Sequence, residues 1–149
     1  MPQNCKKVPL TEVIKFFVED IDGTGKHDGF PRNEGVPDVL RLCREWSLCE
    51  LSEVELMHLL NPDGSNTLIG EKDINTTEGD SRETIEKYLA ILEAGGEIPA
   101  LIVRTKLQGE REDSSFYIED GAHRAIALKV YSEKNPYKLV KAYIGERVN

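Results

Sequence analysis

The stretch Tyr117-Ile-Glu-Asp-Gly-Ala-His-Arg-Ala-Ile-Ala127 decides the expected fold, because it joins a strand to a helix through a single glycine. Tyr117 and Ile118 favour an extended strand, and Gly121 allows a turn with no side chain in the way. The alanines that follow favour a helix. The first N–H groups of such a helix lack partners within it, and its N-terminus carries about half a positive charge. The stretch therefore predicts an anion-binding turn that suits phosphate.

Four residues of this turn are candidates for phosphate binding, namely Gly121, Ala122, His123 and Arg124. The small side chain of Ala122 keeps the first turn of the helix slim. The planar guanidinium of Arg124 matches the geometry of a phosphate group, and His123 adds one or two further donors. A plainer interpretation stays open, in which Asp120 only caps a helix whose first turn holds a histidine and an arginine.

Helices and strands alternate on both sides of the turn. In chain order we expect a helix at 81–93 that is ended by two glycines, strands at 98–104 and 115–118 joined by a charged hairpin at 108–113, the helix from Gly121, and a strand at 138–144. Apolar side chains at helical spacing carry the first of these predictions, and β-branched or aromatic runs carry the strands. This order predicts an α+β fold.

The N-terminal third is expected to be mainly helical. The predicted elements are a helix at 10–19, a glycine-rich loop at 22–35, a helix at 37–46, a strand at 48–51, and a helix at 52–60. Ser52 and Glu55 have the spacing of a capping box for the last of these helices. We therefore expect a helical N-terminal extension over residues 1–45, followed by one domain over residues 46–149 in which helices flank a small mixed sheet.

Residues 81–144 resemble the ParB/sulfiredoxin-like superfamily. In that superfamily a helix, a strand containing an Ile-Pro pair, a hairpin and a Gly-x-His-Arg turn that opens a helix occur in this order. The corresponding residues here are Ile98-Pro99 and Gly121-Ala122-His123-Arg124. With Asp120 in front, the turn is similar to that of ParB-like nuclease-type domains and free serine kinases. The resemblance implies a bound nucleotide of the ATP or ADP type, with the histidine and the arginine as direct phosphate ligands.

Two differences from the superfamily exclude functions that some of its members have. Sulfiredoxins have their catalytic cysteine in the x position, and here that position is Ala122, so we expect no sulfinic acid reduction. Chromosome-partitioning ParB proteins continue into a helix-turn-helix DNA-binding domain, whereas this chain ends at Asn149, shortly after its last predicted strand. We therefore expect nucleotide hydrolysis or phosphoryl transfer, for example to a small hydroxyl-bearing metabolite such as free serine.

Phosphoryl transfer needs a carboxylate near the phosphates and usually a divalent cation. Glu119 and Asp120 are the candidate catalytic residues, and as neighbours on an extended segment they point to opposite sides. We favour Asp120, which directly precedes the helix, as the base or as the ligand of Mg²⁺. Arg82 is a second basic candidate for the phosphates, although an ion pair with Glu86 one turn later explains it equally well.

Composition limits the partners and the compartment. The formal net charge of −8 argues against a surface devoted to nucleic acid, so DNA is not favoured as a partner. No apolar run approaches the roughly 18 to 20 residues that span a bilayer, and we expect no membrane contact and a cytoplasmic location. The three cysteines, Cys5, Cys43 and Cys49, lack the spacing of a zinc site and are expected to be reduced thiols.

Two other classes of function remain alternatives to phosphoryl transfer. One is a noncatalytic or nuclease-like ParB-type module that acts with DNA and a partner protein, which predicts salt-sensitive DNA binding. The other is a noncatalytic sensor that binds a nucleotide without turnover. For phosphoryl transfer and for the sensor, the expected ligand is a nucleotide bound at Gly121–Arg124.

Overall fold

The computed structural model describes residues 2–18, 40–60, 79–105 and 116–146, without the side chains of residues 79–81. The helices and strands in this part of the chain are, in order, β1 (Gln3–Val8), α1 (Leu10–Val18), β2 (Glu45–Leu51), α3 (Glu53–Met57), α4 (Gly79–Glu93), β3 (Leu101–Arg104), β4 (Tyr117–Asp120), α5 (Ala122–Ser132) and β5 (Val140–Glu146). The chain is thus an α+β protein, as its pattern predicts.

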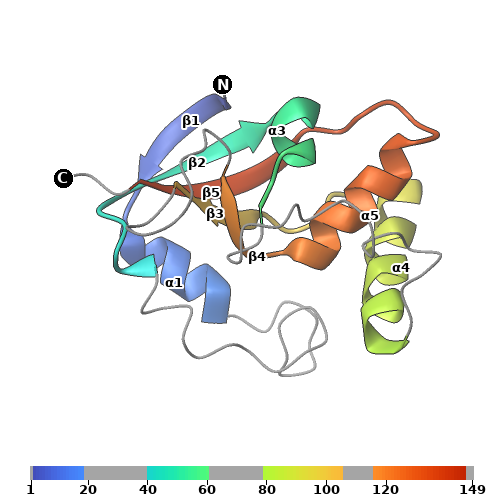
Figure 1. The fold of residues 1–149 in the computed structure, drawn as a ribbon, viewed down its shortest axis with the longest axis horizontal. Coiled ribbons are helices and arrows are strands. Elements are labelled where there is room, and N and C mark those ends of the chain that lie inside the picture. Colours follow the sequence, from blue (N-terminus) through green and yellow to red (C-terminus); the bar gives the residue numbers. More distant parts are fainter. Residues whose placement is uncertain (1, 19–39, 61–78, 106–115, 147–149) are drawn as a thin grey trace.

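The five strands form one open mixed sheet in the order β1-β2-β5-β3-β4 (Figure 1). Neighbouring strands are antiparallel except for β3 and β5, which run parallel. Beyond β4, Leu60 extends the sheet by a single bridge, since its N–H donates to Phe116 O and its carbonyl accepts from Ile118 N. The predicted hairpin of β3 and β4 is confirmed by their antiparallel pairing, while its tip at 108–113 lies outside the described residues.

Helices cover both faces of the sheet (Figure 1). On one face α4 and α5 pack together over the sheet, and alternate strand residues such as Leu101 and Val103 point into this core. On the other face α1 lies over the sheet, and Phe17 packs with Ile102 and Tyr143. Since Ile102 lies between Leu101 and Val103, β3 contributes to both cores and is buried along its whole length.

Local sequence signals place several helices correctly. The predicted helix at 10–19 is α1, and the predicted capping box at α3 is present: Ser52 Oγ accepts from Glu55 N at 3.2 Å while Ser52 N donates to Glu55 Oε1 at 2.8 Å. The predicted helix at 81–93 is α4, which begins slightly earlier. Its end is also as expected, because Gly95 adopts a left-handed φ of 85° and donates to Leu92 O.

Two N-terminal predictions need correction. The helix expected at 37–46 cannot extend to its predicted end, because residues 45 and 46 belong to β2; residues 37–39 lie outside the described part. Trp46 is buried as the spacing indicated, but it is buried from a strand that pairs with β5 over seven residues. The strand β1 was not expected at all, because most of its residues are polar and show no strand-like alternation; all but Val8 are exposed. Its pairing with β2 holds it in the sheet.

The prediction of three reduced cysteines is wrong for two of them. Cys5 in β1 and Cys49 in β2 form a disulfide, whereas Cys43 is a buried thiol outside any disulfide. The reason is tertiary: the antiparallel pairing of β1 and β2 brings two Cα atoms that are 44 residues apart in sequence to 4.1 Å. Within the described residues, no helix is both long and apolar enough to cross a membrane.

Gly145 in β5 is needed to accommodate the indole of Trp46. A Cβ atom at Gly145 would lie 2.6 Å from Trp46 Cη2 and Cζ2 and 3.0 Å from Cys43 Cβ. We therefore expect Gly145→Ala to lower the free energy of unfolding by about 1–3 kcal/mol, the usual cost of overpacking a core. Urea denaturation measures this. Adding Trp46→Phe removes the two indole atoms that the new Cβ atom would meet. The double variant should therefore lose less free energy of unfolding than the two single variants lose together; equal losses would contradict the assigned contact.

The buried hydroxyl of Tyr137 is expected to make the free energy of unfolding fall at alkaline pH. Its hydroxyl donates to Leu51 O at 2.8 Å, and burial, together with the carboxylates of Glu53 and Glu55, raises its pKa above the usual 10.0. When the pKa of a tyrosine is higher in the folded than in the unfolded state, its hydroxyl stabilises the fold fully at pH values below the unfolded-state pKa. This stabilisation is lost as the pH rises from the unfolded-state pKa to the folded-state pKa. Between about pH 9 and 11, unfolding of the natural chain should become easier by up to about 1.4 kcal/mol per pH unit relative to Tyr137→Phe. Parallel pH profiles would count against this role for Tyr137.

Candidate functional site

The turn between β4 and α5 has the backbone that the sequence predicts. β4 ends at Asp120, Gly121 adopts a left-handed conformation with φ 104° and ψ 20°, and α5 begins at Ala122. A Cβ atom at Gly121 would lie 2.7 Å from Leu101 Cδ2 and 3.0 Å from Arg124 Nη2. Both the backbone angle and the space therefore require glycine.

The side chain of Arg124 lies inside the fold beneath this turn. Its Nη2 donates to Asp120 Oδ2 at 2.7 Å and its Nη1 donates to Ala100 O at 2.7 Å. The side chain of Arg124 is 0% exposed and that of Asp120 is 9% exposed. The guanidinium thus ties the end of β4 to the segment before β3. Its predicted direct contact with a phosphate stays a prediction.

The start of α5 has no side-chain cap from its own N-cap residue, because that residue is Gly121. The carboxylate of Asp120 forms an ion pair with Arg124 through its Oδ2 atom. Ala122 and His123, the two other predicted phosphate contacts, are partly exposed at this end of the helix. The turn therefore presents a positive helix end to the surface over a buried ion pair.

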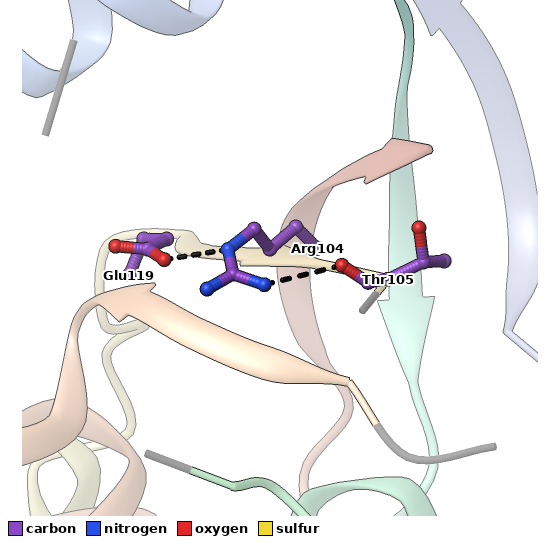
Figure 2. A network of polar contacts seen from close by, with 3 residues as sticks. All are labelled: Arg104, Thr105 and Glu119. Carbon is purple, nitrogen blue, oxygen red and sulfur yellow. Dashed lines mark hydrogen bonds and ion pairs between the residues drawn. The ribbon is translucent and has the colours of Figure 1, made fainter. Parts of the chain in front are cut away.

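Glu119 belongs to a second buried ion pair, which Figure 2 shows from close by. Arg104 Nε donates to Glu119 Oε1 at 2.6 Å, and Arg104 Nη1 donates to Thr105 O at 3.3 Å. The two charged side chains are 3% and 7% exposed, and Arg104 Cζ lies 5.1 Å from the ring centre of Tyr117. Glu119 and Asp120 are thus held by different arginines. The sequence reasoning missed Arg104, although a charged residue closing the apolar strand Leu101–Arg104 was a usable signal.

Arg82 forms the ion pair with Glu86 that was the alternative to a phosphate contact. It is exposed on α4, and its Nε donates to Glu86 Oε1 at 2.7 Å, one turn further along the helix. The predicted contact of Arg82 with a nucleotide stays a prediction.

The predicted metal also stays a prediction. Among the described residues, no group of three or more His, Cys, Asp or Glu side chains is arranged to hold an ion. Such a group is not what Mg²⁺ needs at a phosphoryl-transfer site, where one or two carboxylates act together with the phosphates of the substrate. Asp120 remains the carboxylate nearest to the start of α5 in sequence.

A cavity of about 410 Å³ opens at the same end of the sheet as the turn. Ala100, whose carbonyl accepts from Arg124, lines it, but residues 119–124 do not. Its other walls come from the end of α4 and the residues that follow it, from the start of β5 and the residues before it, and from Leu128 of α5 and Glu50 of β2. The turn and the cavity are thus separate features, and Ala100 is in contact with both.

The chain was compared with protein-family models, with curated proteins and with solved structures, and no match was found. The resemblance to the ParB/sulfiredoxin-like superfamily therefore rests on the order of elements and on residues 120–124. What is established for this chain is a mixed five-stranded sheet flanked by helices, in which a left-handed glycine opens α5 above a buried Asp120–Arg124 pair.

Proposed function

We propose that this chain binds a nucleotide of the ATP or ADP type, with the phosphates at the start of α5. The observation that carries the proposal is the left-handed Gly121, which turns the chain from β4 directly into a helix with no side-chain cap from its N-cap residue. Helix N-termini of this kind attract anions, because their first N–H groups have no partner within the helix and the helix dipole adds positive charge.

In this proposal the residues of the turn have different roles. Ala122 and His123 contact the phosphates, through backbone N–H groups and through the imidazole. Arg124 is a positioning residue: its bonds to Asp120 and Ala100 hold the turn in one geometry before the ligand arrives. Such preorganisation favours binding, because less conformational freedom is lost when the ligand is bound.

The reaction that we propose is transfer of a phosphoryl group to water or to a small hydroxyl-bearing acceptor such as free serine. Asp120 is the carboxylate that would orient or deprotonate the acceptor, and Mg²⁺ would bind together with the phosphates. One observation favours a second candidate, a nucleotide sensor without turnover. Both candidate carboxylates, Glu119 and Asp120, are already engaged by buried arginines.

Nucleotide binding is tested first by thermal unfolding in the presence of ATP, ADP and inorganic phosphate, each with and without Mg²⁺. A ligand present at 100 times its dissociation constant stabilises the folded state by about 2.7 kcal/mol, which is a clear rise in Tm for a domain of this size. If no nucleotide raises the Tm under any of these conditions, nucleotide binding is rejected.

A charge placed at the start of α5 tests the position of the phosphates. Ala122→Asp puts a carboxylate on a helix N-terminus, which stabilises the helix by about 0.3–1 kcal/mol or leaves the fold unchanged. The same carboxylate repels a phosphate, so we expect nucleotide affinity to fall at least about tenfold, or 1.4 kcal/mol. Ala122→Asn is the matched neutral control and should retain more of the affinity. Calorimetry measures both variants; equal affinities in Ala122→Asp and Ala122→Asn would place the phosphates elsewhere.

Turnover is separated from sensing by a product assay on the purified chain. Release of phosphate or of a phosphorylated acceptor supports the enzyme, and Asp120→Asn should then lower the rate while His123→Ala lowers the affinity. Stable binding of ATP with no product over hours supports the sensor.

A further inference from the structure

The cavity at the end of the sheet is a second feature with the properties of a ligand site, and the proposed nucleotide turn does not use it. Its volume of about 410 Å³ is in the range of small-molecule sites. Its apolar wall includes Leu92 of α4, Leu128 of α5 and Val140 of β5, all buried. The cavity thus has an apolar lining supplied by three different elements.

Lys138 is a charged residue of this cavity whose ammonium group has two defined contacts. Its Nζ donates to Leu92 O at 3.3 Å and lies 5.2 Å from the ring centre of Tyr131. The side chain is half-buried, and no carboxylate in the described part of the chain forms an ion pair with it. An ammonium group has three N–H donors, and the bond to Leu92 uses one of them. These two contacts position the ammonium group, and Lys138 is one of the residues that line the cavity.

The other charges of the lining largely offset one another. Lys141 in β5 lies opposite Glu50 in β2 in the antiparallel register, so these two opposite charges are cross-strand neighbours. The carboxylate of Glu50 also accepts a hydrogen bond from the amide of Asn4. Glu97 is exposed to solvent, where its charge is well screened. The charge that the fold holds beside the apolar wall is therefore that of Lys138.

We propose that this cavity binds a small organic carboxylate with an apolar body, and that Lys138 receives its carboxylate group. Two remaining N–H donors on one ammonium match the two oxygens of a single carboxylate. A polyphosphate carries more negative charge than this one lysine offsets. The ligand class thus differs from that proposed for the turn at Gly121, and the proposal does not rest on nucleotide binding.

Lys138 also has a purely structural explanation, because a cation near the last carbonyls of α4 stabilises the helix end. The two explanations make different predictions. A helix cap contributes to stability whether or not a carboxylate is present. A ligand contact is measured as an affinity that depends on the negative charge of the ligand.

The test uses phenylacetate and its neutral analogue phenylacetamide, titrated into the whole chain and followed by amide chemical shifts. We expect phenylacetate to shift the amides of Gly95, Gly96 and Lys141 with a dissociation constant of about 1 mM or tighter, and phenylacetamide to bind at least tenfold more weakly. Lys138→Met should weaken phenylacetate binding at least tenfold, and Lys138→Arg should restore most of it. Lys134→Met is the matched control, because Lys134 is exposed and does not line the cavity.

Three results would overturn the proposal. The first is no shift of the cavity amides with phenylacetate at up to about 10 mM, where even a weak complex of this size forms. The second is equal binding of the acid and the amide by the natural chain, which needs no variant and so does not depend on the folding of any mutant. The third is unchanged phenylacetate binding in Lys138→Met, which would leave Lys138 as a helix cap only.

Discussion

Replacing Arg124 by methionine is expected to lower the free energy of unfolding by about 3–5 kcal/mol, because Asp120 then keeps a negative charge inside the fold without its cation. Methionine has a similar length, so the change removes charge and hydrogen bonds more than volume. The bond to Ala100 O is lost as well, which leaves a carbonyl at the cavity without its donor. Urea denaturation followed by circular dichroism measures the loss.

The matched control for this substitution is Arg82→Met. Arg82 has a similar i,i+4 ion pair with Glu86 at the same distance of 2.7 Å, but its side chain is 45% exposed. Exposed pairs of this kind contribute about 1 kcal/mol at most. The double variant Asp120→Asn, Arg124→Met should recover part of the loss, since it removes both charges. If Arg82→Met and Arg124→Met lower the free energy of unfolding by similar amounts, the burial assigned to the Asp120–Arg124 pair is contradicted.

Arg104→Met is the second substitution with a large expected effect, again about 3–5 kcal/mol in the free energy of unfolding. It strands the buried Glu119 carboxylate and removes the bond to Thr105 O (Figure 2). It also ends the contact between the guanidinium and the Tyr117 ring. Because β3 and β4 are joined here, the loss should be accompanied by faster amide exchange in β4.

Glu119→Gln and Lys129→Met complete this comparison. Glu119→Gln keeps a hydrogen-bond acceptor for Arg104 but removes the negative charge of this buried pair, so it should also be destabilising. Lys129→Met breaks a partly exposed pair with Glu133 at 3.9 Å and should change stability by less than about 1 kcal/mol. If Arg104→Met behaves like Lys129→Met, the Arg104–Glu119 pair contributes little to the fold.

These two arginines affect how the nucleotide proposal must be tested. A loss of binding in an Arg124 variant has two explanations, a lost phosphate contact or a disordered turn. Ala122→Asp avoids this ambiguity, because its expected effects on stability and on nucleotide affinity have opposite signs. Binding should therefore be judged from Ala122 and His123 variants, and Arg124 variants from their stability.

Short-range patterns were enough to predict most helices and the turn. The capping box at Ser52 and Glu55 and the glycines after α4 act within one helical turn, so a window of a few residues contains all of the signal. The same is true of Gly121, where a strand pattern, a glycine and a helix pattern follow one another directly. For the turn, the order of residues predicted the backbone but not the direction in which Arg124 points.

The elements that were missed depend on partners far away in the chain. β1 is polar and exposed, and its place in the sheet comes from pairing with β2. Trp46 fits a helical pattern by spacing, yet its strand is fixed by β5, where Gly145 lies opposite it and leaves room for its ring. Local propensity gives way in both cases because pairing with a distant strand decides the conformation, and for Trp46 burial adds to this.

The sequence by itself determined the α+β class, the order of most elements and the glycine turn that opens α5, because these follow from periodicity and capping within a few residues. Only the tertiary structure decided that Arg124 and Arg104 lie buried in ion pairs, that Cys5 joins Cys49, and that Lys138 lies beside a cavity. Each of these depends on which strands lie side by side, and hydrogen bonds that join residues such as Ala100 and Arg124 exist only once the sheet has assembled.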